Sequence, residues 1–315
     1  MQKGCNIMPI SNYPNGFASG VAIRGMPILN GYGGDIYWVD SGAGSNSNDG
    51  THNRPFSTLD YAVGRTKADN ADIIMVKAGH SEEVTAAAGL ALDVAGITII
   101  GLGNGSNRPT INFTTAVTAD MDVDAANITI SNFLFTGGID ALTGIIDVNA
   151  ADFSMINCET RDVTGQMTDC IVADANADRM LIDGWAHRGA AAAGGASALQ
   201  LVGGDDTMIR NFWIDGNFDT AAIENVTTAA VNLTINGGAN GSYIRTRNAA
   251  DVAFTAVATT TGNVGPNIYA RLQDDAANVT EAFVGADMQF FQPIAIANAD
   301  GQVGMNTNIT ASTDA

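Results

Sequence analysis

One short pattern recurs six times along the chain: in outline apolar, any residue, apolar, any residue, then Asn or Gly. Successive copies start 31, 25, 27, 27 and 26 residues apart. Repeats with a period in this range are typical of solenoids. The two-residue alternation predicts a strand with one buried face, and the closing Asn or Gly suits a turn, because both tolerate left-handed backbone angles. The copies begin at Ile97, Ile128, Phe153, Met180, Thr207 and Leu233.

One or two further strands fit the same period. One is predicted just upstream of each copy, at residues 121–124, 145–148, 171–174, 199–202 and 223–226. Just downstream, a large side chain often follows the Asn or Gly, as at Phe133, Cys158, Trp185 and Phe212, which indicates either a third strand or a ladder of stacked side chains. Strands repeated in every turn of chain and stacked on their own copies form an all-β parallel β-helix. The alternative is an antiparallel sandwich with coincidental spacing.

The ends of the chain lack the period. Residues 1–35, rich in Pro and Gly, predict an extended N-terminal arm, and residues 36–280 are predicted to form the β-helix. Within that region, residues 55–63 predict a short helix that caps the first turn, with Ser57 or Thr58 at its N-cap. Residues 281–315 predict a C-terminal cap and a loose tail.

Composition excludes several classes of function. The net charge of −19 disfavours nucleic-acid binding, because such a surface repels phosphates. The three cysteines fit no metal-binding spacing and predict no disulfide framework. We expect no membrane span and no signal peptide, since the sequence shows neither a long apolar run nor a basic, then apolar N-terminus.

The opening of the repeat region resembles right-handed parallel β-helix proteins of the pectate-lyase-like superfamily. The resemblance rests on YWVDS at 37–41, NDGT at 48–51, RPFSTL at 54–59, DIIMV at 72–76, AGH at 78–80 and ITIIG at 97–101. It implies a single-stranded right-handed parallel β-helix. The arm, at residues 8–17 and 23–28, is similar to that of tailed-phage and prophage virion proteins with this fold. The family's enzymes act on acidic polysaccharides, but a fold does not determine a function.

Acidic side chains recur at positions that the period brings close together. The weak candidates for a Ca²⁺ site are Asp122, Asp147 and Asp174, since stacked carboxylates suit a hard cation. A solvated acidic face is the alternative, and no cofactor is predicted otherwise.

Enzyme chemistry has weaker indications in the sequence. Asp205 and Asp206 form an adjacent carboxylate pair, but their Gly-rich surroundings favour a turn. Trp38, Trp185 and Trp213 would stack on sugars if exposed, and Trp185 is predicted to be buried. The arginines of the repeat region show no catalytic pattern; they are Arg161, Arg179, Arg188, Arg210, Arg245, Arg247 and Arg271.

From these features we predict a non-enzymatic virion structural protein, a capsid decoration or cement protein that clamps neighbouring shell subunits. Its partners would be two further copies in a homotrimer and the major capsid protein, with no nucleic acid and no membrane. It would be made in the host cytoplasm and lie on the capsid surface. A tail fibre or spike that binds host glycans is the first alternative, and a polysaccharide lyase or glycoside hydrolase is the second. The predicted attachment residues are Tyr13, Phe17, Val21, Ile23, Ile28, Phe290 and Phe291.

Overall fold

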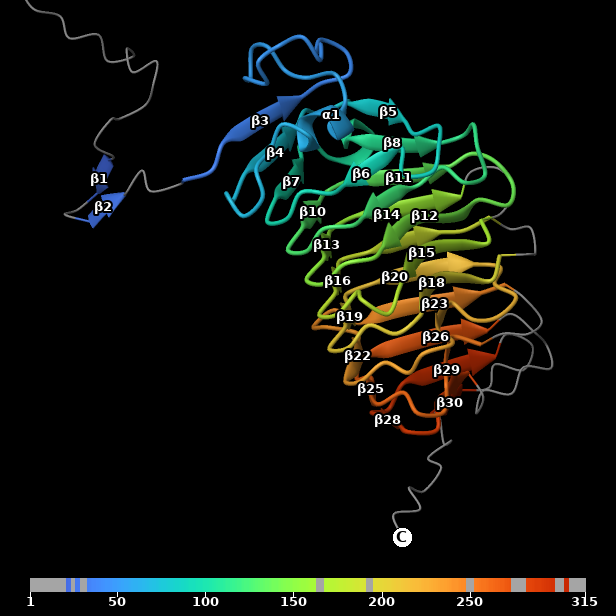
Figure 1. Cartoon of the computed structure of the whole chain (residues 1–315). Helices are drawn as coiled ribbons and strands as arrows, with labels where there is room; N and C mark the ends of the chain where they lie inside the picture. Colours follow the sequence, from blue (N-terminus) through green and yellow to red (C-terminus); the bar gives the residue numbers. More distant parts are fainter. Residues whose placement is uncertain are drawn as a thin grey trace, which may run out of the picture. The chain divides into compact units, whose positions relative to one another are not determined.

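The chain forms a parallel β-helix, as predicted (Figure 1). The structure is a computed structural model that describes residues 21–23, 26–28, 33–162, 167–190, 195–247, 252–272, 282–297 and 303–305. Residues 1–34 and residues 35–315 form two separate compact units. Within the first unit, β1 (Val21–Ile23) pairs antiparallel with β2 (Met26–Ile28).

Three sheets run the length of the second unit, and each turn of chain, or rung, adds one strand to each sheet. Neighbouring strands pair in parallel from rung to rung, up to the antiparallel pair that ends sheet 2.

Sheet 1 contains β3 (Ile36–Val39), β4 (Ile73–Val76), β7 (Thr98–Gly101), β10 (Thr129–Ser131), β13 (Ser154–Ile156), β16 (Leu181–Asp183), β19 (Met208–Arg210), β22 (Leu233–Asn236), β25 (Gly262–Val264) and β28 (Met288–Phe290).

Sheet 2 contains β5 (Ser81–Glu83), β8 (Thr110–Phe113), β11 (Leu134–Gly137), β14 (Glu159–Asp162), β17 (Ala186–Arg188), β20 (Trp213–Gly216), β23 (Ser242–Thr246), β26 (Ile268–Leu272), β29 (Ile294–Ala297) and β30 (Val303–Met305).

Sheet 3 contains β6 (Leu90–Leu92), β9 (Met121–Val123), β12 (Thr143–Val148), β15 (Asp169–Ala173), β18 (Ser197–Leu201), β21 (Ile223–Asn225), β24 (Phe254–Ala256) and β27 (Phe283–Val284).

The turn from sheet 1 to sheet 2 uses the residue that closes the repeat. Asn132, Asn157, Gly184 and Asn211 all have positive φ, between 53° and 76°. Asn and Gly occupy this left-handed region at least cost. The Asn132 side chain also donates a hydrogen bond of 2.8 Å to the carbonyl of Gly101 in the preceding rung. The predicted turn chemistry is therefore confirmed at these four positions.

The core is a continuous stack between the three sheets. Alternation places every second side chain of a strand inside, and parallel register stacks it on its counterparts. In sheet 1 the stacked and fully buried side chains are Ile99, Ile130, Met155, Ile182, Ile209 and Ile235.

A short helix packs at the N-terminal end of the stack, where sheet 3 has no counterpart to β3 and β4 (Figure 1). This helix, α1 (Leu59–Val63), lies within the predicted residues 55–63 and buries Leu59, Ala62 and Val63. Thr58 is its N-cap residue, but its side chain makes no capping hydrogen bond. The Glu82 carboxylate accepts a hydrogen bond of 2.8 Å from the Leu59 amide instead. A 3₁₀ helix spans Gly105–Asn107, and neither of these described helices has the length and apolar character needed to cross a membrane.

A substitution in the stack tests the fold. Ile182→Ala is expected to lower the free energy of unfolding by about 2–5 kcal/mol, because it leaves a cavity between Met155 and Ile209. Its neighbour Leu181 lies on the outer side of the same strand and is half-buried, so Leu181→Ala should cost much less. Chemical denaturation measures both values, and equal losses would contradict the assigned inner and outer faces.

Candidate active site

The outer side of sheet 3 carries a cluster of carboxylates, which we call the acidic face; it consists of Asp120, Asp122, Asp124, Asp147 and Asp174. Asp122 on β9 and Asp147 on β12 are direct partners in the parallel register. Asp122 and Asp147 occupy equivalent positions in their strands, so both side chains point outward; both are half-buried.

A single amide links two of these carboxylates. The Asn149 side chain donates hydrogen bonds of 2.6 Å to Asp122 Oδ1 and 3.3 Å to Asp124 Oδ1. At the other edge of the cluster, the Ala88 amide donates a hydrogen bond of 2.5 Å to Asp120 Oδ1. These contacts hold the carboxylates in place without supplying a positive charge.

Partial burial, together with the crowding of like charges, changes the acidity of this cluster. Partial burial, and then the charges of Asp124, Asp147 and Asp120, raise the pKa of Asp122 to about 6. Partial burial, followed by the charges of Asp120 and Asp174, also raises the pKa of Asp147. A carboxyl with a pKa near 6 can hold a proton at mildly acidic pH and donate it.

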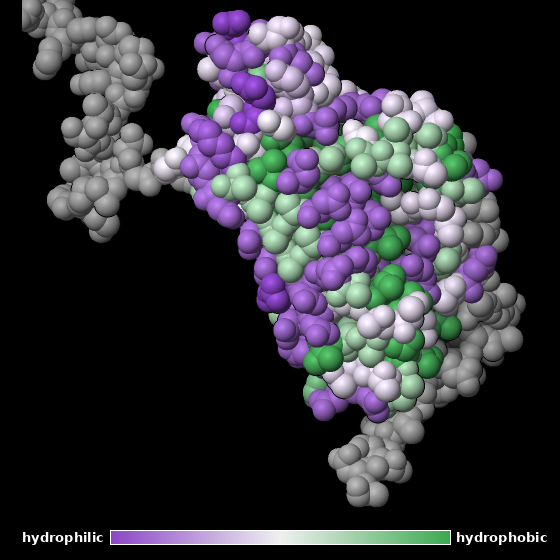
Figure 2. Space-filling view, in the orientation of Figure 1, coloured by the Kyte–Doolittle hydropathy of each residue, from purple (hydrophilic) through white to green (hydrophobic). Residues whose placement is uncertain are grey.

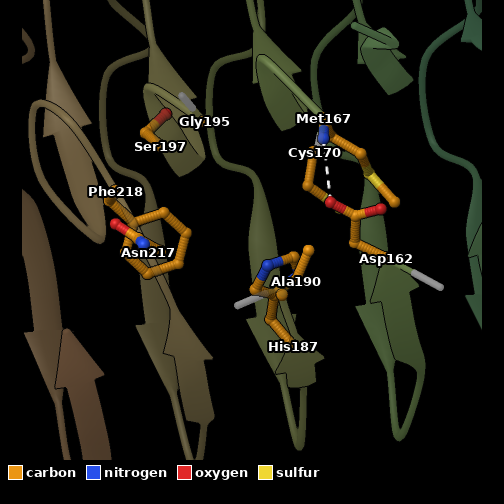
Figure 3. A pocket seen from close by; sticks show the side chains of 10 residues that line it. Asp162, Met167, Cys170, His187, Ala190, Gly195, Ser197, Asn217 and Phe218 are labelled. Atoms are coloured by element: carbon orange, nitrogen blue, oxygen red, sulfur yellow. Dashed lines mark hydrogen bonds between the residues drawn. The ribbon is translucent and has the colours of Figure 1, made fainter. Parts of the chain in front are cut away.

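A small cavity lies where sheet 2 turns into sheet 3, and side chains from several rungs line it (Figure 3). Its volume is about 20 Å³, and Asp162, His187 and Ser197 help to line it. Burial raises the pKa of Asp162 to about 6, whereas burial lowers the pKa of His187 to about 4. A cavity of this size has room for about one water molecule, so it is too small for a sugar ring.

Glu159, on the outer side of sheet 2, is in the opposite electrostatic state. Glu159 accepts hydrogen bonds from Arg108, Arg161 and Arg188. Burial opposes ionisation there, but these guanidinium groups lower the pKa of Glu159 to about 2. Among the described residues, the aspartates with raised pKa lie on the outer side of sheet 3 or at its border with sheet 2; they are Asp120, Asp122, Asp147, Asp162 and Asp169. Ionisable groups with perturbed pKa values cluster at functional sites.

The structure brings together only part of the predicted Ca²⁺ ladder. Val172, and not Asp174, is the register partner of Asp147, because Asp174 lies two residues further along the chain. In the described part of the chain, no group of three or more His, Cys, Asp or Glu side chains is arranged to hold a metal ion.

The other predicted residues are dispersed. Asp205 and Asp206 lie in a turn, as predicted. Trp185 is buried, and Trp213 is half-exposed on sheet 2.

Of the predicted attachment residues, Tyr13 and Phe17 lie outside the described residues, and Val21, Ile23 and Ile28 belong to the pair β1–β2. Phe290 is half-buried and Phe291 is exposed.

Sequence reasoning missed Asp162, Asp169 and the gathering of arginines around Glu159. The register of sheet 2 was the available signal, since Arg161 and Arg188 are partners in it.

The sequence matches no model of a known protein family and no curated protein. Its fold is similar to that of a GH136 lacto-N-biosidase from Eubacterium ramulus, with 15% identity, a TM-score of 0.52, and 84% of this chain and 56% of that one covered. A rhamnogalacturonan lyase matches with 14% identity, a TM-score of 0.46, and 78% and 75% covered. This chain thus spans little more than half the length of the lacto-N-biosidase, and the likeness concerns the fold.

The match to the lacto-N-biosidase contradicts the prediction of a non-enzymatic virion structural protein that decorates a capsid. The solved structure with a TM-score of 0.52 is that of an enzyme and not of a virion protein. The prediction was wrong because it relied on a few residues of the N-terminal arm, most of which lie outside the described residues. The resemblance to pectate-lyase-like proteins is confirmed for the parallel β-helix itself. The predicted partners and localisation stay predictions.

The raised pKa of Asp122 has a consequence for stability. Its pKa in the folded protein lies above the usual aspartate value near 3.9, so the fold loses stability as the pH rises from about 4 to about 6, and the loss is complete above about pH 6. We therefore expect Asp122→Asn to raise Tm at about pH 8 and to raise it much less at about pH 4.5. Thermal melting at both pH values measures the effect.

Asp152→Asn is the matched control. The hydrogen bond from Arg179 lowers the pKa of Asp152, so removing this carboxylate should bring no gain of Tm at the higher pH. An equal gain in both variants would contradict the account of crowded charges on the acidic face.

Proposed function

We propose that the protein is a glycoside hydrolase that acts through the carboxylates of the acidic face. The observation that carries this proposal is the direct register of Asp122 with Asp147, together with the raised pKa of Asp122. Glycosidases generally use two carboxyl groups, one protonated and one ionised. The fold shared with a lacto-N-biosidase supports the same class of reaction.

The spacing of the two residues suits one form of the reaction. Neighbouring strands of a parallel sheet lie ~4.8 Å apart, and the two carboxyl groups of retaining glycosidases lie about 5–5.5 Å apart. In this arrangement Asp122 donates its proton to the glycosidic oxygen as that bond breaks, while Asp147 attacks the anomeric carbon. Water then hydrolyses the glycosyl–Asp147 ester and gives a proton back to Asp122.

The same face does not suit a lyase. A lyase removes a proton next to a sugar carboxylate, which calls for a basic side chain and a positive charge beside the substrate. The described positions in register with Asp122 are Ala91, Asp147, Val172, Gln200, Glu224, Thr255 and Val284, and none of them is basic. Of the two enzyme classes in the second alternative, the acidic face therefore favours a glycoside hydrolase over a polysaccharide lyase.

Hydrolysis of a panel of neutral and acidic polysaccharides and their oligosaccharides tests the proposal. We expect new reducing ends and a bell-shaped pH profile that falls above about pH 6, where Asp122 loses its proton. Asp122→Asn and Asp147→Asn should each lower kcat/KM by about 10²-fold or more.

The matched control is again Asp152→Asn, which removes a carboxylate that lies in the turn between β12 and β13 and pairs with Arg179, and this variant should retain activity. The proposal fails if no member of the panel is cleaved, if both acidic-face variants keep full activity, or if the products carry the unsaturated sugar that a lyase leaves.

A further inference from the structure

The outer side of sheet 2 carries a column of aromatic side chains. Trp213 on β20, Tyr243 on β23 and Tyr269 on β26 are successive partners in the parallel register. The rings of Trp213 and Tyr243 are nearly parallel, with an interplanar angle of 16° and centroids 6.5 Å apart. Tyr269 is 42% exposed. Large aromatic rings kept at a protein surface commonly mark a binding surface.

A cleft of about 290 Å³ opens beside this column. Small residues make room for it, because Gly184, Ala186 and Gly241 lie around Trp213 and Tyr243. Ala186 is the register partner of Trp213 in the preceding rung, so the aromatic column ends at Trp213 and a small side chain follows it. Asn211 and Asn240 add polar groups to the rim. An apolar floor with a few polar groups is typical of a ligand site.

Arginines surround the same column. The guanidinium of Arg188 lies over the Trp213 ring, 4.8 Å from its centroid. Its Nε donates a hydrogen bond of 2.8 Å to Glu159, and 55% of its side chain is exposed. The described residues offer no protein partner for its two terminal nitrogens. Arg188 is therefore placed to donate a pair of hydrogen bonds to an anionic group above Trp213.

The charges of this face do not cancel. Three arginines share the single carboxylate of Glu159, and Arg245 and Arg247 share that of Asp215. Each group thus has more positive than negative charge, in a chain whose net charge is −19. Figure 2 shows hydrophilic residues gathered across the middle of the visible face. A positive region on an acidic protein attracts an anion to one place.

We propose that the outer side of sheet 2 is a second, non-catalytic site that binds an acidic glycan chain, one that carries carboxylate or sulfate groups. Sugar rings pack in the cleft against Trp213 and Tyr243, and the anionic groups pair with Arg188 and its neighbours. The aromatic column follows the axis of the β-helix, so the glycan lies along that axis. The site is separate from the acidic face, which would repel the same ligand.

Binding of dextran sulfate, with unmodified dextran as the matched neutral polymer, tests the proposal by calorimetry on the full chain. Polygalacturonate serves as the carboxylated probe, and an oligothymidylate as the nucleic-acid probe. We expect at least one acidic polysaccharide to bind more tightly than dextran and oligothymidylate, and its affinity to fall with salt. Arg188→Gln should weaken it about tenfold, as the loss of one charge-assisted contact predicts. Trp213→Ala should weaken it by about as much, because it removes the ring against which a sugar packs.

Arg179→Gln is the control, because Arg179 is similarly exposed, at 52%, but pairs with Asp152 away from sheet 2. Melting curves establish that each variant is folded. The proposal is overturned if neither acidic polysaccharide binds, if dextran or oligothymidylate binds as tightly, or if Arg179→Gln weakens binding as much as Arg188→Gln. Asp122→Asn should bind the glycan normally, so failure of the hydrolase proposal and failure of this one give different results.

Discussion

Parallel hydrogen bonding between successive rungs determines where every side chain of the β-helix lies. A strand such as β9 has no stable partner within its own rung, and it pairs with β6 and β12 of the adjacent rungs. This pairing fixes the register, and the register decides which side chains stack inside and which line up outside. The carboxylates of the acidic face, the aromatic column and the arginines of sheet 2 are neighbours because of this register.

The same constraint gives the carboxylates of sheet 2 and sheet 3 different neighbours. On sheet 3, Asp122 and Asp147 face each other without a cation, so the pKa of each is raised by burial and by neighbouring charge. On sheet 2, Glu159 and Asp215 are held by arginines that lower the pKa of both carboxylates against the effect of burial. A chain with a large net negative charge thus presents one face that can hold a proton and another that can hold an anion.

Much of the fold could be predicted from the sequence because the repeat is local. The alternation and the closing Asn157 or Gly184 identify strand, face and turn without knowledge of distant contacts. The pairing of Asp122 with Asp147 could be predicted from their spacing of 25 residues. The predicted third member, Asp174, is not in register with them, because the residue that pairs with Asp147 in the next rung is Val172. Arg161 and Arg188 follow their copies of the repeat at the same spacing, but Arg108 lies in a longer loop, between β7 and β8, so the complete arginine cluster was not predicted. Function was predicted wrongly because fold and net charge do not specify a site.

The titration of Asp122 and Asp147, followed by carbon-detected NMR of their carboxyl groups, tests the central claim most directly. If adjacent rungs hold the two side chains together, Asp122 titrates near pH 6, and Asp147→Asn moves that titration to lower pH. Two independent titrations near pH 4, unaffected by substitution of the other residue, would contradict the stacked pair and with it the proposed active site.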